Sequence, residues 1–410
     1  MLKVIELFSG IGSQAEALKR TGVEHEVVAT SDIDIYANKT YRFLHGFVPN
    51  FGDISKIEEL PKADLWTYSF PCTDISISGQ MKGFDKGSET GSSLLWEVQR
   101  LLEVSKEKGS LPRFLLMENV KNIVSKRFMP LFQVWIDYLE SLGYKSFYKV
   151  LNAKEYGVPQ NRERCFMLSV LNYDGDFKFP EEQELQTFLQ DLLEPNVAER
   201  FFLSDRFIRY ACDMENRNGF IRGVRFRPHD GESKVAYTIT TNPGGRATDN
   251  FVILPAVGAI RGRPDGNGGY KQKLHVKDEP ITNTITTVQK DNVILVPQAT
   301  KAGYAAAEVG DGIYTNRMKW KRGVVQKSMI PTLKTSLDIG VVVEDKDELI
   351  NIRRLTPREC WRLMGWNDER IDRAFESGCS ETQYYRMAGN AIVVNVLEAI
   401  FKEMKAQFDL

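Results

Sequence analysis

The strongest constraint on the fold is the alternation of short apolar runs with helical periodicity over the first 170 residues. Apolar runs of strand length stand at residues 2–8, 25–30, 64–70, 113–118 and 165–171. Helical patterns separate them, at residues 13–20, 34–45, 94–105 and 128–142. This alternation predicts a doubly wound, parallel α/β sheet, whose ligands bind at the carboxyl ends of the strands.

Length and composition place this sheet in a globular protein of two domains. The chain has 410 residues, 42% of them hydrophobic and 27% charged, and a domain typically takes about 150 residues. The sequence contains no apolar run of about 18 residues, the length that a membrane span needs. We interpret the N-terminal residues as a first strand rather than a signal peptide.

Cysteine usage points to a reducing compartment. The cysteines are widely spaced and form no CxxC pair: Cys72, Cys165, Cys212, Cys360 and Cys379. This pattern argues against a disulfide framework and against a Cys-rich zinc site.

A second domain is predicted after about residue 172, where the composition and the residue pattern of the sequence change. Residues 200–340 hold 15 of the 31 glycines and alternate short β-branched runs with turn signals, as a loop-rich β segment does. A TITT-like motif recurs at 238–241, 284–287 and 332–335, each time before an apolar strand. We interpret this recurrence as an internal structural repeat within about 223–345.

Charge is divided unevenly between the two regions. The whole chain has a net charge of −1, but residues 200–340 carry 22 Lys and Arg against 13 Asp and Glu, a net of +9. The rest of the chain is therefore at −10. A basic, glycine-rich β segment fits the phosphates of a nucleic acid, and the Arg-rich stretch 221–229 adds to this footprint.

A nucleotide-type turn joins the first strand to the first helix. Gly10, Gly12 and Ala15 satisfy G-x-G-x-x-A, in which the glycines allow a tight turn and the close approach of a ligand. Asp32 follows the second strand, where a carboxylate can accept both ribose hydroxyls of an adenosine. The pattern fits NAD enzymes and S-adenosylmethionine (AdoMet) enzymes equally. Asp53, after a third possible strand, either reaches the adenine amino group or caps a helix.

Cys72 is the candidate nucleophile. It follows Pro71 and the apolar run 64–70, and it precedes a glycine-rich loop that can close over a substrate. A thiol has an ordinary pKa of about 8.5, so this one needs a depressed pKa or a nearby base to be a thiolate at neutral pH. The histidines stand elsewhere in the sequence, which disfavours a Cys–His hydrolase.

Charged residues stand beside two further strands. Glu118 ends an apolar run, so we expect it to be partly buried and either ion-paired or raised in pKa and able to donate a proton. Arg162 and Arg164, two residues apart, point the same way if the chain is extended there. They are candidates to bind a carbonyl or phosphate oxygen.

Taken together, these motifs resemble those of the C5-cytosine DNA methyltransferases of bacteria and phages. The motifs occur in the family's order: Phe8-x-Gly10-x-Gly12, Asp32, Gly52-Asp53-Ile54, Pro71-Cys72, Glu118-Asn119-Val120, Gln160-x-Arg162-x-Arg164, Arg354 to Glu359, and Gly389-Asn390. They span nearly the whole chain and leave only about 173–350 without a motif. That gap is where the family carries its target recognition domain.

The resemblance implies an AdoMet-dependent methyltransferase (Rossmann-like) α/β sheet with a smaller, mostly β target recognition domain. The catalytic domain would be discontinuous, with residues 1–172 and about 380–410. The recognition domain would occupy 173–379, with a supporting segment at 352–366.

The activity implied is methyl transfer from AdoMet to C5 of a flipped-out cytosine in a specific duplex DNA sequence, with S-adenosyl-L-homocysteine as the product. The enzyme would be a monomer in the cytoplasm of a bacterium or a phage-infected cell. It would act in a restriction–modification system, beside a separate cognate endonuclease, or as an orphan enzyme.

Roles for individual residues follow from the same resemblance. Cys72 attacks C6 of cytosine and forms a covalent adduct, Glu118 contacts ring N3 and the exocyclic amine, and Arg164 with Arg162 holds the O2 side. The residues expected to bind the cofactor are Phe8, Gly10, Gly12, Asp32, Ile33, Asp53, Pro71 and Asn390. Those expected to contact DNA are Gln160, Arg222, Arg225, Arg227, Thr240, Thr286 and Arg358. A metal site is not expected.

Two positions depart from the family pattern. Thr73 stands where the family commonly has Gln after the catalytic cysteine. Ile33 stands where the family commonly has an aromatic residue that stacks on adenine. Because Ile33 can still cover the adenine face by apolar contact, we expect weaker cofactor binding rather than loss of activity.

Three other functions stay open on the sequence. An NAD-dependent oxidoreductase accounts for the glycine turn and Asp32 but leaves Cys72 and Glu118 unexplained. A tRNA cytosine methyltransferase is disfavoured by the long basic region, because a large groove-reading domain suits duplex DNA. A catalytically silent DNA-binding module is disfavoured by the intact set of Cys72, Glu118 and Arg164.

Overall fold

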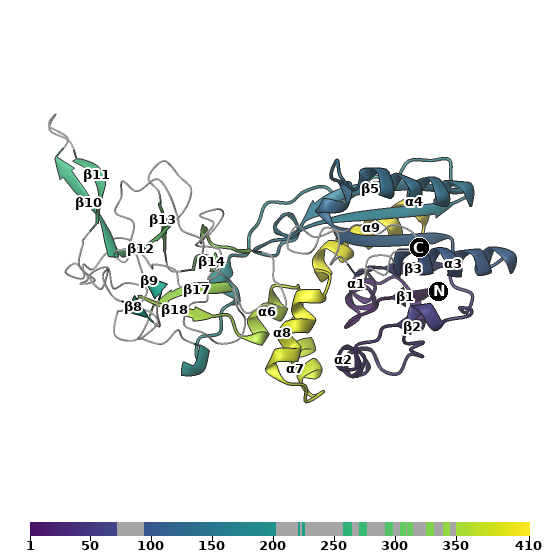
Figure 1. The fold of residues 1–410 in the computed structure, drawn as a ribbon, viewed down its shortest axis with the longest axis horizontal. Coiled ribbons are helices and arrows are strands. Elements are labelled where there is room, and N and C mark those ends of the chain that lie inside the picture. The colour runs from purple at the N-terminus through teal and green to yellow at the C-terminus, as the bar shows by residue number, and fades with distance from the viewer. Residues whose placement is uncertain are drawn as a thin grey trace. The chain divides into compact units, whose positions relative to one another are not determined.

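The computed structural model describes residues 1–71, 94–201 and 350–410 (Figure 1). Between the last two ranges it describes the short segments 220–221, 224–225, 257–264, 270–276, 292–297, 304–308, 310–314, 325–331 and 339–344. These residues belong to two compact units. The first comprises Met1–Thr187 and Pro357–Leu410, and the second lies within Phe188–Pro331 and Leu337–Thr356.

A six-stranded sheet forms the centre of the first unit, in the order β2-β1-β3-β4-β7-β5. Its strands are β1 (Leu2–Leu7), β2 (His25–Ser31), β3 (Leu65–Tyr68), β4 (Phe114–Val120), β5 (Tyr144–Asn152) and β7 (Glu163–Leu171). The first four run parallel, but β7 runs antiparallel to both of its neighbours. The short connection between β5 and β7 cannot form the crossover that parallel pairing requires. The expectation of a wholly parallel sheet is therefore wrong at β7.

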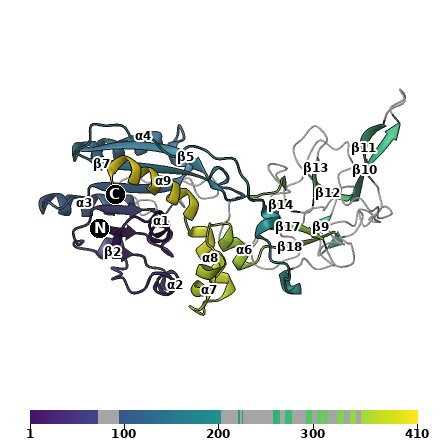
Figure 2. The ribbon, with the colours of Figure 1, turned by 180° about the vertical axis from the view of Figure 1, so that it is seen from behind.

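Helices cover both faces of the sheet, which confirms the doubly wound α/β class (Figure 1 and Figure 2). The α-helices of this unit are α1 (Ser13–Thr21), α2 (Ile35–His45), α3 (Leu95–Glu107), α4 (Met129–Ser141), α6 (Pro357–Arg362), α7 (Asp368–Phe375), α8 (Glu381–Asn390) and α9 (Val394–Phe408). α3 and α4 share a hydrophobic core with Ile5, Trp66 and Met117 on one face. On the other face, the rings of Phe114 and Phe408 lie with centroids 5.1 Å apart, and α9 packs beside α1.

Short elements complete the first unit: the 3-10 turns η1 (Ile54–Lys56), η3 (Lys121–Val124) and η4 (Ala153–Tyr156), and strand β6 (Gln160–Asn161). The third strand predicted before Gly52 is reduced to a single parallel bridge between Thr30 and Asn50. α6 begins at Pro357, and proline is favoured at the first position of a helix because the N–H that it lacks would have no partner there. Within the part of the chain that the structure describes, no helix is long and apolar enough to cross a bilayer.

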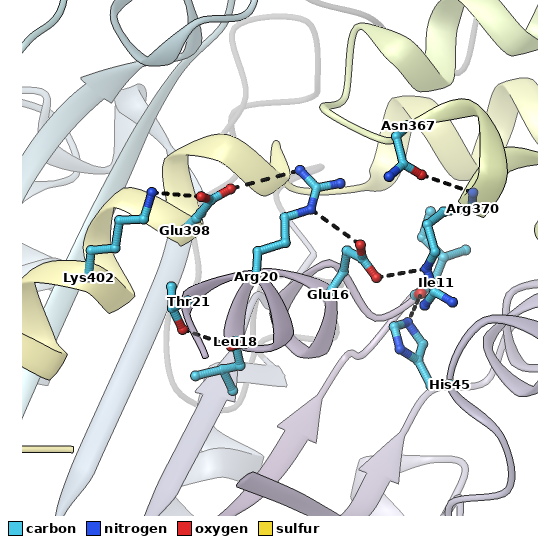
Figure 3. A network of polar contacts seen from close by, with 10 residues as sticks. All are labelled: Ile11, Glu16, Leu18, Arg20, Thr21, His45, Asn367, Arg370, Glu398 and Lys402. Carbon is cyan, nitrogen blue, oxygen red and sulfur yellow. Dashed lines mark hydrogen bonds and ion pairs between the residues drawn. The ribbon is translucent and has the colours of Figure 1, made fainter. Parts of the chain in front are cut away.

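Within the first unit, charged side chains join the C-terminal helices α7 and α9 to α1, as Figure 3 shows. Arg370 on α7 donates from Nε to Oε2 of Glu16 on α1 at 2.9 Å. Arg20 on α1 pairs with the same Glu16 at 3.2 Å and reaches Glu398 on α9 at 3.9 Å. The first unit extends to Thr187 and resumes at Pro357. The boundaries expected from the sequence, 172 and about 380, stay predictions.

The second unit is built from antiparallel strands. One sheet has the order β11-β10-β12-β13, another β15-β14-β17-β18, and β8 pairs with β9. The strands of this unit are β8 (Phe220–Ile221), β9 (Val224–Arg225), β10 (Val257–Pro264), β11 (Tyr270–Val276), β12 (Asn292–Pro297), β13 (Tyr304–Ala307), β14 (Gly312–Tyr314), β15 (Val325–Gln326), β16 (Ile330–Pro331), β17 (Ile339–Glu344) and β18 (Ile350–Arg354). It also contains the 3-10 turns η5 (Leu189–Leu192) and η6 (Glu199–Phe201).

Only part of the predicted internal repeat falls on described residues. β12 and β17 correspond to the apolar strands expected after the second and third TITT-like motifs, and they lie in different sheets. The motifs themselves, at 238–241, 284–287 and 332–335, lie outside the described residues. The repeat therefore stays a prediction.

Candidate active site

A pocket of about 490 Å³ opens in the first unit, next to the carboxyl ends of β1, β2, β3 and β4. Most of the residues that the sequence singles out for cofactor and catalysis line it: Phe8, Gly10, Asp32, Ile33, Asp53, Pro71, Glu118, Arg162, Arg164 and Asn390. They come from segments at both ends of the chain. The doubly wound fold places its ligand site at this edge of the sheet, as the sequence predicts.

The turn after β1 has a left-handed backbone at Phe8, Gly10 and Gly12, with φ values of 57°, 54° and 78°. A Cβ added at Gly10 would meet no atom within 4 Å, so this glycine leaves open space at the pocket wall. A Cβ added at Gly12 would lie 2.5 Å from His45 Nε2 and 2.6 Å from Tyr41 Cε2. Glycine at position 12 therefore permits close packing against α2, and its expected contact with the cofactor stays a prediction.

Asp32, just beyond β2, is fixed by backbone donors on both of its carboxylate oxygens. Oδ2 accepts a hydrogen bond from Gly10 N–H at 2.7 Å, and Oδ1 accepts one from Asp34 N–H at 2.8 Å. Burial raises the pKa of Asp32, and these two N–H groups act in the opposite direction. A carboxylate has about four lone-pair sites, so acceptor capacity remains on the pocket side.

Ile33 and Asp53 flank Asp32 at the pocket. The Ile33 side chain lines the pocket and is 74% exposed, so an apolar surface is open to a ligand there. Asp53 accepts hydrogen bonds from both N–H and Oγ of Ser55 and caps η1. These bonds lower the pKa of Asp53. The capping alternative is thus confirmed, and a contact with adenine stays a prediction.

Glu118 and Arg164 form a buried ion pair on β4 and β7, with Arg164 Nε 3.1 Å from Glu118 Oε1. Burial raises the pKa of Glu118, while the charges of Arg164 and Arg162 lower it in part. Both expectations for Glu118 are therefore met, because its carboxylate is ion-paired and its pKa is raised. The pair thus combines a carboxyl group whose pKa is raised with the guanidinium group of Arg164 beside it.

Arg162 points elsewhere, because the residue lies between β6 and β7 and not inside one extended strand. Its guanidinium Nη2 donates to the carbonyl oxygens of Gly389 at 3.2 Å and Ala391 at 2.8 Å. Arg162 therefore holds the C-terminal segment that carries Asn390 against the pocket. The condition for Arg162 and Arg164 to point the same way, an extended chain, is therefore not met, and the catalytic role of Arg162 stays a prediction.

Two of the residues expected at DNA have other contacts. Gln160 is fully buried and donates from Nε2 to the carbonyl oxygen of Leu363 at 2.6 Å, so its side chain is not at the surface. Arg358 pairs with Asp372 and with Asp368 on α7. Its charge is therefore compensated within the first unit. For both residues, contact with DNA stays a prediction.

Several other predicted positions are not described. Cys72, Thr73, Arg222, Arg227, Thr240 and Thr286 lie outside the described residues. Arg225 lies in β9, but its side chain is not part of the description. Their roles stay predictions.

The structure adds contacts that the sequence does not reveal. Asn119 Nδ2 donates to the carbonyl oxygen of Phe70 at 3.1 Å and so ties the end of β4 to the segment that leads into Pro71. Arg386 on α8 lies 3.5 Å from Asp34 at the pocket. The Glu-Asn-Val motif points to Asn119, but no local pattern distinguishes Arg386.

Unsatisfied polar groups at the pocket fit a polar ligand. Ser9 and Ser13 line the pocket. Their hydroxyl groups are buried and have no hydrogen-bond partner among the described residues. Buried polar groups normally have partners, so a ligand carrying donors and acceptors suits this wall. Among the residues that the structure describes, no group of His, Cys, Asp and Glu side chains is arranged to hold a metal ion.

Comparison with known protein sequences places the site in a family. Residues 2–406 match the family described as C-5 cytosine-specific DNA methylase. The chain is 30% identical to the type II methyltransferase M2.ScrFI of Lactococcus lactis subsp. cremoris, over 98% of this chain and 99% of that protein. It is 29% identical to the orphan methyltransferase M.SPRI of Bacillus phage SPR, over 98% and 97% of the two chains.

Solved structures agree at the level of the fold. Dnmt2 methyltransferase of S. pombe superposes with a TM-score of 0.54 at 17% identity, over 100% of this chain and 99% of that chain. A putative DNA modification methyltransferase encoded within an E. coli prophage has the same TM-score and identity and covers both chains fully. A family match of this extent excludes the NAD-dependent oxidoreductase. The chain belongs to the C-5 cytosine-specific DNA methylase family and is a DNA (cytosine-5-)-methyltransferase.

Proposed function

We propose that this enzyme binds AdoMet in the pocket beside the glycine turn and methylates a flipped-out cytosine of a specific duplex DNA sequence through a covalent Cys72 adduct. The observation that carries the proposal is the Glu118–Arg164 pair, which opens into the same pocket as Gly10 and Asp32. One pocket then holds a cofactor wall and a base-binding wall. Pro71, the residue before Cys72, lines it as well.

The cofactor wall suits an adenosine and an amino acid. The unused acceptor capacity of Asp32 suits the ribose hydroxyls, and Ile33 offers an apolar face for adenine. The unpartnered hydroxyls of Ser9 and Ser13 suit the polar methionine end. When bound, AdoMet supplies an electrophilic methyl group, and S-adenosyl-L-homocysteine is its product.

The base-binding wall supplies the chemistry at the cytosine. Burial favours the protonated form of Glu118, which donates to N3, and Arg164 stabilises the charge that develops on the O2 side. The Cys72 thiolate bonds to C6 and gives C5 the electron density to accept the methyl group. Loss of the C5 proton to water then expels the sulfur of Cys72.

The second unit is the proposed reader of the DNA sequence. Its region 200–340 has a net charge of +9, as a phosphate-binding domain requires. Arg222, Arg225, Arg227, Thr240 and Thr286 stay the candidate DNA contacts. Relatives named as type II and as orphan methyltransferases support either a restriction–modification setting or an orphan role, in the cytoplasm of a bacterium or a phage-infected cell.

A mechanism-based trap tests the proposal. Duplex DNA containing 5-fluorocytosine has no proton to lose at C5, so we expect the wild-type enzyme with AdoMet to form a covalent complex that survives denaturing electrophoresis. Cys72→Ser should form no such complex and transfer no methyl group, while it still retards duplex DNA in a native gel. Retained methyl transfer by Cys72→Ser contradicts the covalent mechanism. Faster methylation of tRNA than of duplex DNA contradicts the proposal that duplex DNA is the substrate.

A further inference from the structure

Asp32 must present its carboxylate accurately, although its own backbone lies outside the regular strand. β2 ends at Ser31, so Asp32 is the first residue beyond the regular strand. Its peptide groups are held by side chains instead. Asn50 Oδ1 accepts a hydrogen bond from Asp32 N–H at 3.0 Å, and Asn50 Nδ2 donates to the Asp32 carbonyl oxygen at 3.1 Å.

Asn38 on α2 adds a second donor to the same carbonyl. Its Nδ2 lies 2.8 Å from the Asp32 oxygen. The orientation of the Asn50 amide is fixed by its contacts, because Oδ1 accepts from Gly52 N–H at 3.1 Å as well as from Asp32 N–H. Reversing the amide would place its NH2 group against two N–H donors. The Asn50 side chain therefore joins the peptide of Asp32 to the turn that leads into Asp53.

These bonds complement those on the carboxylate, which accepts hydrogen bonds from the N–H groups of Gly10 and Asp34. With its peptide and its carboxylate both restrained, the remaining acceptor sites of Asp32 have a defined direction. Preorganisation of this kind raises affinity because less freedom is lost when the ligand binds.

We propose that Asn50, assisted by Asn38, is a positioning residue that orients Asp32 for the ribose hydroxyls of the cofactor. The inference rests on the proposed function, in which Asp32 binds that ribose. Asn50 is itself exposed to solvent. Its truncation leaves groups that water can satisfy, so the free energy of unfolding changes little while the Asp32 carboxylate loses its fixed direction.

The test compares Asn50→Ala, Asn38→Ala and the double variant with the wild type. The control is Lys39→Ala, which changes the exposed neighbour of Asn38 on the same helix. Binding of S-adenosyl-L-homocysteine is measured by calorimetry, and kcat and the KM for AdoMet are measured with duplex DNA. We expect Asn50→Ala to raise the Kd and the KM about tenfold, the size of one charge-assisted hydrogen bond, and to leave kcat unchanged. Lys39→Ala should behave as the wild type.

A ligand analogue separates positioning from a general structural effect. With S-adenosyl-L-homocysteine that lacks the ribose 2′-hydroxyl, the loss caused by Asn50→Ala should shrink, because the contact that Asn50 supports is already missing. An equal loss with both ligands overturns the proposal, as does a loss equally large in Lys39→Ala. Asp32→Ala separates the proposed ribose contact of Asp32 from the positioning role of Asn50. If it leaves the Kd unchanged, the ribose role of Asp32 is wrong. If it raises the Kd while Asn50→Ala does not, only the positioning role is wrong.

Discussion

Arg164 Nε lies 3.1 Å from Glu118 Oε1, across the antiparallel pairing of β4 and β7. The reversed strand β7 thus brings a cation to a carboxyl group near the end of β4, two residues before the strand ends at Val120. Opposite influences meet at Glu118, because burial raises its pKa and the two arginine charges lower it. A carboxyl group whose pKa is raised by burial and that lies beside a fixed cation suits a role in proton exchange during catalysis.

The first prediction concerns this pair. Glu118→Gln keeps the shape and a hydrogen bond to Arg164 but cannot exchange a proton, so we expect kcat to fall about 10²- to 10³-fold, as for loss of a general acid. The Kd for AdoMet should stay unchanged, because the cofactor wall is intact. The rate of single-turnover methyl transfer to duplex DNA reports the change in the catalytic step, and calorimetry measures the Kd for AdoMet. A kcat close to that of the wild type would remove Glu118 from the proposed chemistry.

The second prediction separates the two glycines of the turn. Gly12→Ala forces a methyl group against His45 and Tyr41, so we expect a loss of stability of about 3 kcal/mol from overpacking and left-handed strain together. Gly10→Ala puts its methyl group into open space at the pocket and should cost about 1 kcal/mol, while it weakens AdoMet binding. Thermal unfolding and calorimetric titration distinguish the two outcomes. Equal melting temperatures for the two variants would contradict the assignment.

The third prediction is a pH dependence of stability that comes from Glu6. This carboxyl is fully buried in β1 and accepts hydrogen bonds from Ala15 N–H and Tyr41 O–H. Burial raises its pKa from 4.5 to about 7. Between these values the folded state keeps a proton that the unfolded state releases. Stability should therefore fall by about 3 kcal/mol as the pH rises through this range and level off above it.

Glu6→Gln removes that titration. The difference in the free energy of unfolding between wild type and Glu6→Gln should change with pH from about 5 to 7 and stay constant above that range. Urea unfolding at a series of pH values measures it. Parallel profiles for the two proteins would mean that Glu6 titrates normally.

The fourth prediction concerns the network of Figure 3, and it is asymmetric. Glu16→Leu leaves the buried Arg370 without its carboxylate and should cost about 3–5 kcal/mol, the loss typical of an uncompensated buried charge. Arg370→Leu leaves Glu16 still paired with Arg20, so the loss should be smaller. Differential scanning calorimetry ranks the two variants. The reverse order would show that Arg20 does not compensate Glu16.

Local sequence patterns predict the parts of the site that depend on position along a strand. The turn at Gly10, the acid at Asp32 and the carboxyl at Glu118 each follow an apolar run that becomes a strand, and the sheet brings them to one edge. Contacts between distant segments were not predictable in this way. The Arg162 side chain is directed by its hydrogen bond to the carbonyl oxygen of Ala391. The buried Gln160 side chain is held by its hydrogen bond to the carbonyl oxygen of Leu363. The need for glycine at position 12 likewise comes from His45.

The return of the C-terminal helices has a consequence for synthesis on the ribosome. A nascent chain released only as far as residue 350 already carries Gly10, Asp32 and Glu118, but it lacks the Met387 and Ile392 side of the pocket and the α9 that packs beside α1. The face of the sheet around Phe114 then stays uncovered until translation is nearly finished. A late frameshift therefore yields an exposed apolar fragment, a substrate for chaperones and proteases, rather than a weakened enzyme.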